Sequence, residues 1–210
     1  MLPISREVQV RAGAEADITA LTELYNHYVR ETALTFDTEP FTPEQRRPWL
    51  LSHPEDGPHR LLVAQQEPDT TDRWKFRHTG ADGAGDGTAT AGADGAAAGA
   101  ARGALLGYAT SSPFRPKAAY ATSVEVTVYC APHAAGRGIG TLLYRALFAA
   151  LADEDVHRAY AGIAQPNAAS TRLHTRFGFR HIGTYTEVGR KFGRYWDVAW
   201  YQKDLGRARG

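Results

Sequence analysis

The sequence predicts an α+β fold, in which a mixed β-sheet carries helices on both faces. Three observations support this prediction. Stretches with the alternation of strands and stretches with helical spacing follow one another in the order β-α-α-β-β-β-α-β-α-β-β. The 210 residues suit a single domain, 1–210, with a substantial core. At the centre, residues 123–151 combine a strand, a glycine-rich loop and a helix.

The first part of the chain predicts one strand and two helices. Residues 7–11 (EVQVR) alternate as a short strand, and residues 14–32 carry apolar side chains at helical spacing. A second helix begins after Thr42, which suits the N-cap. Pro43 fits the first helical position, and Gln45 completes a capping box with Thr42.

Two further strands are separated by a long segment of biased composition. Residues 61–65 (LLVAQ) and 105–111 (LLGYATS) are apolar runs that predict strands. From Thr79 to Ala104, glycine and alanine supply 19 of 26 residues, and leucine, isoleucine, valine and phenylalanine are absent. Because such a segment has little to bury against the entropy of ordering it, we expect residues 67–104 to form a flexible insertion between the two strands.

The central stretch predicts an anion-binding site. Valine at every second position from Val124 indicates a strand, which ends before Pro132 because proline cannot continue a central ladder. Gly136, Gly138 and Gly140 then precede a helix with one apolar face. Backbone N–H groups at the start of such a helix are unpaired and are not shielded by side chains. They suit a phosphate or diphosphate.

The last third of the chain predicts three strands and one helix. Residues 158–164 (RAYAGIA) form a strand, and a helix spans residues 167–177. Gly178 has the residue type that commonly follows the end of a helix. Residues 180–185 and 196–205 complete the predicted sheet, the latter with alternating tryptophan and valine side chains.

Composition argues against several classes of function. The formal net charge of +1, with basic residues spread along the chain, argues against a nucleic-acid partner, and no apolar run is long enough for a membrane helix. Cys130 is the only cysteine, so no intrachain disulfide can form, and we expect a reducing, cytoplasmic location. The eight histidines show no spacing typical of metal ligands, and we predict no metal.

Two motifs resemble those of the GNAT superfamily of acetyl-CoA-dependent N-acetyltransferases. The first is the loop 135–140 (AGRGIG), which is similar to the family's Arg/Gln-x-x-Gly-x-Gly/Ala, although Ala135 replaces the opening Arg or Gln. The second is the segment 167–179, which begins with Asn167 and ends with Gly178 and Phe179. The resemblance implies the GNAT fold, with a mixed, mostly antiparallel central sheet of six to seven strands.

The finer resemblance is to the phosphinothricin N-acetyltransferase branch, and it spans nearly the whole chain except residues 67–104. The segments that carry it are Asn26-His27-Tyr28, Phe36, Thr38-Glu39-Pro40, Ala119-Tyr120, Glu125, Thr127-Val128-Tyr129, Pro166-Asn167, Arg172-Leu173-His174, Lys191 and Asp197-Val198.

This resemblance implies an enzyme that transfers acetyl from acetyl-CoA to the amine of a small amino-acid-like substrate, such as phosphinothricin, methionine sulfoximine or methionine sulfone. Two alternatives stay open. One is an acetyltransferase for another amine, such as a polyamine, an aminoglycoside or a protein N-terminus. The other is a catalytically silent sensor that binds acyl-CoA. The resemblance also implies a homodimer with the C-terminal aromatic strand near its interface.

The resemblance assigns roles to two candidate catalytic residues. Glu125 is the expected general base that takes a proton from the acceptor ammonium, the alternative being a strand carboxylate that faces solvent. His174 stands where many relatives carry a tyrosine that protonates the CoA thiolate. A histidine there could donate or relay a proton, or simply pack in the helix.

The remaining expected site residues bind the two substrates. For acetyl-CoA, we expect contacts from the strand backbone, from the glycine loop and from Asn167, which could instead only cap its helix. These residues are Val128, Tyr129, Cys130, Gly136, Arg137, Gly138, Ile139, Gly140, Thr141 and Asn167. For the acceptor, the matching positions are Phe36, Arg115, Lys117 and Tyr120. The two basic side chains could bind a carboxylate or phosphinate, or belong to a surface loop.

Overall fold

The computed structural model describes residues 8–66 and 103–206, so the predicted insertion lies almost wholly outside the described residues. The strands are β1 (Val8–Ala12), β2 (Leu61–Gln66), β3 (Leu105–Pro113), β4 (Ser123–Cys130), β5 (Arg158–Ala164), β6 (Arg180–Lys191) and β7 (Arg194–Asp204). The α-helices are α1 (Ile18–Glu31), α2 (Pro43–Leu51), α4 (Ile139–Ala150) and α5 (Ala168–Arg176).

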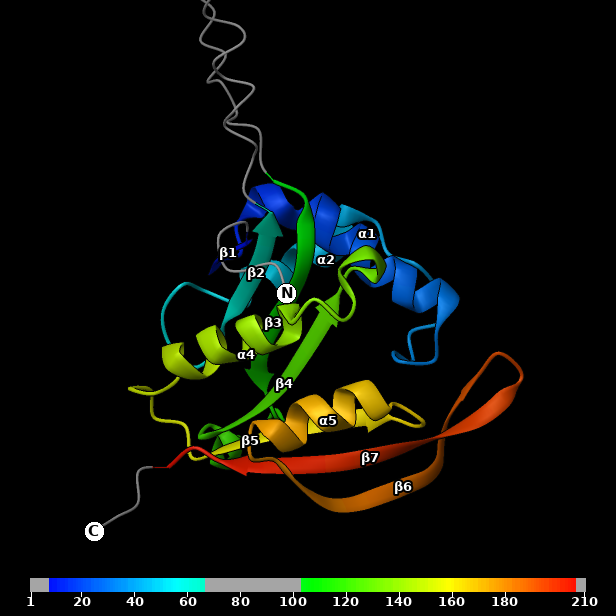
Figure 1. Cartoon of the computed structure of the whole chain (residues 1–210). Helices are drawn as coiled ribbons and strands as arrows, with labels where there is room; N and C mark the ends of the chain where they lie inside the picture. Colours follow the sequence, from blue (N-terminus) through cyan, green and yellow to red (C-terminus); the bar gives the residue numbers. More distant parts are fainter. Residues whose placement is uncertain (1–7, 67–102, 207–210) are drawn as a thin grey trace, which may run out of the picture.

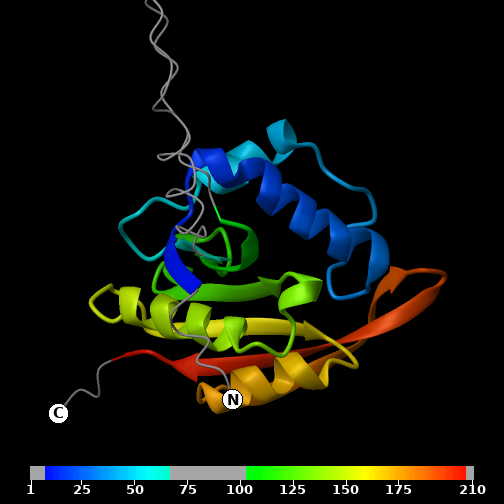
Figure 2. The ribbon, with the colours of Figure 1, turned by 45° about the horizontal axis from the view of Figure 1, so that its top comes forward.

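Within these ranges the seven strands form one sheet in the order β1-β2-β3-β4-β5-β7-β6. Every neighbouring pair is antiparallel except β4 and β5, which run parallel. The prediction of a mixed, mostly antiparallel sheet is confirmed. Figures 1 and 2 show α1 and α2 on one face of this sheet and α4 and α5 on the other.

The alternation of β4 explains why helices cover both faces. Val124 and Val126 are buried and belong to the core that also contains Leu143 and Leu147 of α4. Tyr129 points the other way, where its ring packs against rings of α1. Both faces of β4 are therefore covered, as expected for a central strand of a sheet that lies between two layers of helices.

Local hydrogen bonds determine where each of the two N-terminal helices begins. The capping box of α2 is confirmed, since Thr42 Oγ1 accepts the Gln45 N–H and Gln45 Oε1 accepts the Thr42 N–H. The predicted helix 14–32 differs at its start. A 3-10 turn (Glu15–Asp17) comes first, because the Asp17 carboxylate accepts the Ala14 N–H and pairs with Arg11.

The strands β6 and β7 form a longer hairpin than the predicted 180–185 and 196–205. Their pairing jumps from Tyr185 opposite Val198 to Gly189 opposite Trp196, so β6 carries a bulge. In this bulge Glu187 has a positive φ of 52°, and its N–H donates to Asp197. The bulge interrupts the period-two pattern, which is why the sequence alternation appears to end early.

The strands β4 and β5 diverge soon after they meet. They pair only between residues 123–125 and 158–160, although both continue for several residues beyond. The glycine loop before α4 and the start of α5 lie at the open end of this gap (Figure 1). The fold therefore leaves an unpaired strand edge beside the loop.

Candidate active site

The loop before α4 exposes backbone amides. Gly136 and Gly138 have φ values of +75° and +81°, and no heavy atom lies within 4 Å of the place where a Cβ would stand. Within residues 8–66 and 103–206, the N–H groups of Gly136, Gly138 and Ile139 form no backbone hydrogen bond, whereas those of Arg137 and Thr141 are bonded within the turn. Three amides without a backbone partner in these ranges thus lie at or just before the positive end of a helix, an arrangement that favours an anion.

A cavity of about 290 Å³ lies where β4 and β5 diverge, and we call it the loop cavity. Its lining comes from α1 and the following loop, from β4, from the glycine loop, from β5 and from α5. The lining residues are Tyr28, Leu34, Val126, Thr127, Val128, Tyr129, Cys130, Ala134, Ala135, Gly136, Gly138, Ile139, Gly140, Gly162, Ile163, Ala164, Asn167, Ala169, Ser170, Leu173 and His174.

The edge of β4 presents hydrogen-bonding groups to this cavity. The Ser123 carbonyl and the Ala131 N–H bond toward β3, so the odd-numbered residues of β4 turn their main chain that way. Val126 and Val128 therefore direct N–H and C=O groups into the gap, whereas the main chain of Tyr129 faces β3. At the end of the strand, the Cys130 carbonyl accepts a hydrogen bond from Tyr28 Oη at 2.6 Å.

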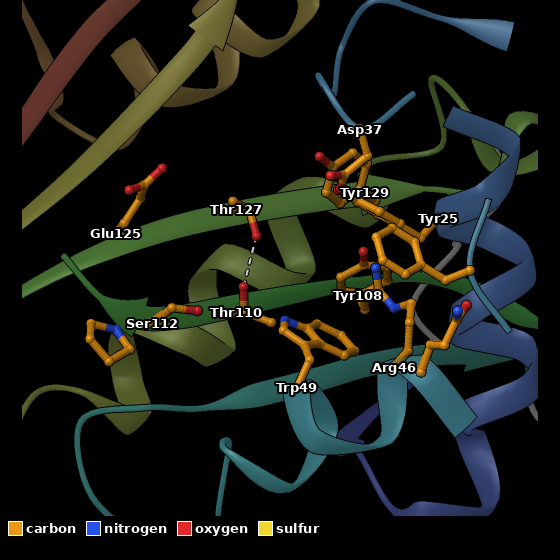
Figure 3. Close-up of a pocket in the computed structure, with 13 residues that line it drawn as sticks. Tyr25, Asp37, Arg46, Trp49, Tyr108, Thr110, Ser112, Glu125, Thr127 and Tyr129 are labelled. Atoms are coloured by element: carbon orange, nitrogen blue, oxygen red, sulfur yellow. Dashed lines mark hydrogen bonds between the residues drawn. The ribbon is translucent and has the colours of Figure 1, made fainter. Parts of the chain in front are cut away.

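A second cavity of about 370 Å³ lies on the α1 and α2 side of the sheet, and we call it the aromatic cavity (Figure 3). Its lining residues are Tyr25, Asp37, Phe41, Gln45, Arg46, Trp49, Tyr108, Thr110, Ser112, Pro113, Glu125, Thr127 and Tyr129. Thr127 and Tyr129 line both cavities, so the two lie side by side along the second half of β4. The loop cavity and the aromatic cavity are therefore neighbours, separated by these residues of one strand.

Glu125 lies at one end of the aromatic cavity, where Figure 3 shows it on β4 beside Thr127. Its side chain is 32% exposed, and Oε2 lies 3.7 Å from Nη1 of Arg115. Burial raises the pKa of the Glu125 carboxyl, and the nearby Arg115 charge opposes that rise. A carboxylate that is harder to keep ionised than usual is a stronger base when it is ionised.

His174 lies on α5 between the loop cavity and α4. Its Nδ1 lies 2.8 Å from the Ser170 carbonyl, which can only accept, so Nδ1 carries the proton. Nε2, 2.8 Å from Tyr144 Oη, is then the acceptor. Burial lowers the pKa of His174, which keeps the ring neutral. Both ring nitrogens are already occupied, and the catalytic role expected for His174 stays a prediction.

Two further expected contacts lie at the loop cavity. Asn167 caps α5, since its Oδ1 accepts the Ser170 N–H at 3.0 Å, and it also lines the cavity. The Cys130 thiol lines the cavity as well. Burial raises the pKa of Cys130 to about 11, so this thiol has little thiolate character at neutral pH.

The structure brings only one of the four expected acceptor residues to the candidate base. Arg115 lies beside Glu125 and over the ring of Phe114, although it is not among the residues that line the two cavities. Lys117 and Tyr120 are exposed and line neither cavity, and Phe36 packs against Gly189 of β6 rather than into the site.

Several side chains of the aromatic cavity were not predicted from the sequence. Tyr25, Arg46, Trp49 and Tyr108 form its far end, where the Arg46 guanidinium lies 4.0 Å from the ring centroids of both Tyr25 and Trp49. One signal was available. Arg46 shares a helical face with Trp49 and Leu50, and a charged residue among apolar ones on a helix is unusual unless a local interaction stabilises it.

Metal-binding clusters and membrane-spanning helices are both absent from the described part of the chain. No group of three or more His, Cys, Asp or Glu side chains in residues 8–66 and 103–206 is arranged to hold a metal ion. None of the helices in the same ranges has both the length and the apolar character needed to span a bilayer.

Comparison with known proteins gives one consistent result. The sequence profile of the acetyltransferase (GNAT) family matches residues 21–179. A phosphinothricin N-acetyltransferase of Streptomyces coelicolor is 63% identical over 97% of this chain and 100% of its own length. An L-methionine sulfoximine/L-methionine sulfone acetyltransferase of Salmonella typhimurium is 29% identical over 93% of this chain and 94% of that protein.

Solved structures agree with the sequence comparison. A phosphinothricin acetyltransferase from Sinorhizobium meliloti, in complex with acetyl-CoA, superposes with a TM-score of 0.74 and 26% identity, covering 95% of this chain and 89% of that one. A Salmonella typhimurium acetyltransferase solved with its cofactor acetyl-CoA gives a TM-score of 0.73 at 26% identity, with 98% of each chain covered. The chain belongs to the acetyltransferase (GNAT) family.

Proposed function

We propose that this enzyme transfers acetyl from acetyl-CoA to the α-amino group of a small amino acid of the phosphinothricin or methionine sulfoximine/sulfone type. One observation carries the proposal. The candidate base Glu125 lies in a cavity that shares two lining residues, Thr127 and Tyr129, with the glycine-loop cavity. The similarity to the Streptomyces coelicolor and Salmonella typhimurium acetyltransferases supports the choice of acceptor.

The loop cavity fits acetyl-CoA. The free amides of Gly136, Gly138 and Ile139 suit its diphosphate, and the unpaired edge of Val126 and Val128 suits an extended amide chain that adds to the strand. When bound, acetyl-CoA supplies the thioester that the acceptor amine attacks. The edge N–H groups of β4 are available to donate to a carbonyl oxygen that gains negative charge.

Glu125 acts on the other substrate. An amine attacks only after its ammonium has lost a proton, and the Glu125 carboxylate stands in the aromatic cavity to receive it. Its raised pKa makes the ionised carboxylate a better acceptor of that proton. Arg115, 3.7 Å from Glu125, is placed to bind the α-carboxylate next to the reacting amine.

The test is release of free thiol from acetyl-CoA in the presence of phosphinothricin, methionine sulfoximine or methionine sulfone. Turnover with these amino acids is expected, and Glu125→Gln should lower kcat by about 10²- to 10⁴-fold, the usual contribution of a positioned base. Glu44→Gln is a suitable control, since Glu44 is exposed at the start of α2. It should leave kcat unchanged.

Two outcomes would contradict the proposal. Turnover of spermidine, an aminoglycoside or a peptide N-terminus, but of none of the three amino acids, would identify another acceptor class. Tight binding of acetyl-CoA without turnover of any amine would indicate a sensor rather than an enzyme.

A homodimer formed through the β6–β7 hairpin is also part of the proposal. The strand β6 is at the edge of the sheet, and five apolar or aromatic side chains of the hairpin are between 46% and 59% exposed. These are Ile182, Tyr185, Val188, Phe192 and Tyr195. Sedimentation velocity should show a dimer that Val188→Glu weakens, whereas Leu51→Glu, on the exposed side of α2, should not. A monomeric wild type would contradict this assembly.

We further propose that the reaction takes place in the cytoplasm. The single cysteine of the chain, Cys130, is compatible with a reducing compartment. Fractionation of cells that express the protein, followed by an activity assay of each fraction, tests this location.

A further inference from the structure

The aromatic cavity contains a buried cation without an anionic partner. Arg46 is only 7% exposed. Among the described residues, no carboxylate forms an ion pair with it, and its Nε has no hydrogen-bond partner. Burying a guanidinium is unfavourable unless its charge is paired. The neighbouring Arg47, in contrast, is exposed and pairs with Glu15.

The surroundings of Arg46 hold it in one plane. Its guanidinium lies 4.0 Å from the ring centroid of Tyr25 and 4.0 Å from that of Trp49, so an aromatic ring packs on each side. Stacking uses the faces of the group, whereas its N–H donors lie along the edge. A preorganised guanidinium of this kind suits bidentate binding of a carboxylate, phosphinate or phosphate.

The position of Arg46 along the sheet determines which part of a substrate it can reach. Glu125, Thr127 and Tyr129 follow one another on the same face of β4, and Arg46 stands at the Tyr129 end (Figure 3). The four residue-to-residue steps from Glu125 to Tyr129 span about 13 Å. An amine bonded to Glu125 and an anionic group four or five bonds away, with a hydrogen bond at each end, cover about 11 Å.

The two cations of the site therefore have separate roles. Arg115 lies beside Glu125, where the α-carboxylate of an amino acid would be. Arg46 stands at the opposite, Tyr129 end of the aromatic cavity. We infer that Arg46 is a specificity-determining residue that binds a second, distal anionic group of the acceptor. The inference rests on the proposed function, and it adds that acceptors with an acidic side-chain end are preferred.

Two acceptors of similar shape test this role. Phosphinothricin has a phosphinate anion at the distal position, whereas methionine sulfone has a neutral sulfone there. Arg46→Gln should lower kcat/KM for phosphinothricin by about 10- to 100-fold, the range for loss of a hydrogen bond to a charged group, and kcat/KM for methionine sulfone by less than about threefold. Arg46→Lys keeps the positive charge but loses the two-pronged guanidinium. Its kcat/KM for phosphinothricin should therefore lie between those of the wild type and Arg46→Gln.

The matched control is Arg47→Gln, which removes an exposed arginine from the same helix and should change neither value. Equal losses for both acceptors, together with a lowered Tm, would show that Arg46 is a structural residue and overturn the inference. If Arg46→Gln does not fold, Arg46→Lys decides. An unchanged ratio of the two kcat/KM values in Arg46→Lys overturns the inference.

A separate outcome identifies failure of the proposed function. If the wild type acetylates neither acceptor although it binds acetyl-CoA, the assignment of the reaction is wrong. The role of Arg46 is then read from calorimetry, in which Arg46→Gln should weaken phosphinothricin binding and leave methionine sulfone binding unchanged. Equal affinity of wild type and variant for phosphinothricin would overturn it.

Discussion

Glu125 illustrates how two opposing effects adjust one group. Partial burial in the aromatic cavity raises the pKa of its carboxyl, and the charge of Arg115 at 3.7 Å opposes the rise. Because the base must be ionised to accept a proton, the rate rises as pH increases through this pKa.

The Arg115→Gln variant tests this balance. It removes the influence that lowers the pKa of Glu125, so the acid limb of the kcat/KM profile should move to higher pH. Lys117→Gln is the comparison, because Lys117 is exposed and lies outside both cavities. The acid limb of the kcat/KM profile of Lys117→Gln should lie at the same pH as that of the wild type. A limb that moves to lower pH in Arg115→Gln would contradict the assignment of Glu125 as the base.

His174 permits a test that separates packing from catalysis. Its ring joins Ser170 and Tyr144 by hydrogen bonds, so His174→Gln should lower the free energy of unfolding by about 1–3 kcal/mol and Tyr144→Phe by about 1 kcal/mol. If His174 only packs, turnover at a permissive temperature should change little. If turnover instead falls by about 10²-fold or more in His174→Gln while Tyr144→Phe stays fully active, proton donation by His174 is supported.

The same histidine contributes to the pH dependence of stability. Burial lowers its pKa below the ordinary 6.5, so the unfolded chain binds a proton that the folded chain does not. The free energy of unfolding therefore falls as pH drops through about 6.5. This part of the decline should be smaller in His174→Gln, as measured by urea unfolding at several pH values. An identical decline would contradict the buried neutral state.

Individual site residues could be predicted only where a local pattern marks them. Glu125 and the loop glycines lie within one strand–loop–helix motif. The glycine pattern predicted an anion site at the loop, and the family resemblance made Glu125 the candidate base. Arg46 was not among the predicted residues because its surroundings are built from segments far apart in the chain. Its stacking partner Tyr25 comes from α1, and Tyr108, which lines the same cavity, comes from β3. Spacing along the sequence carries no information about such contacts.

Among the elements, the start of α4 depends most directly on glycine. Gly138 is the N-cap residue and has the left-handed φ of +81°. An alanine there meets no neighbouring atom, so its effect comes from the backbone conformation and from the methyl group beside the free amides.

Gly138→Ala should lower the free energy of unfolding by about 1 kcal/mol and raise the KM for acetyl-CoA about 10-fold, the effect of weakening one hydrogen bond to a charged group. Gly183→Ala is the matched control, since Gly183 also has open space around it but no positive φ. It should leave the KM unchanged. An unchanged KM in Gly138→Ala as well would show that the loop does not bind the diphosphate.

Most elements, but not all their ends, could be predicted from the sequence. Thr42 and Gln45 mark the start of α2 because capping is a local interaction. The hairpin of β6 and β7 was predicted too short, because the bulge around Glu187 is set by pairing with the opposite strand and by the bond to Asp197. Pairing between strands leaves little trace in the sequence of one strand alone.

At the scale of the whole molecule, the site depends on strand divergence. Every residue of β4 and β5 could be assigned to a strand from alternation, yet the sequence could not show that the two strands pair only over residues 123–125 and 158–160. The loop cavity lies where the two strands diverge.

Lys191 links the β6–β7 hairpin to the loop that contains Thr35. This residue, near the tip of the β6–β7 hairpin, is only 4% exposed, and its Nζ donates to the Thr35 carbonyl at 2.8 Å. The loop that contains Thr35 also carries Leu34, which lines the loop cavity, and Asp37, which lines the aromatic cavity. One buried ammonium therefore holds a segment that contributes to both cavities.

Lys191→Met keeps the length of the side chain and removes the hydrogen bond. We expect the free energy of unfolding to fall by about 1–3 kcal/mol, since the Thr35 carbonyl loses a charged donor. The KM values for both substrates should rise while kcat changes less, because the loop shapes binding but holds neither Glu125 nor the β4 edge. Lys203→Met is the control, because it makes the same substitution at a lysine that packs over Phe148 of α4 and not on the Thr35 loop. Unchanged KM values in Lys191→Met would show that the loop keeps its position without the hairpin.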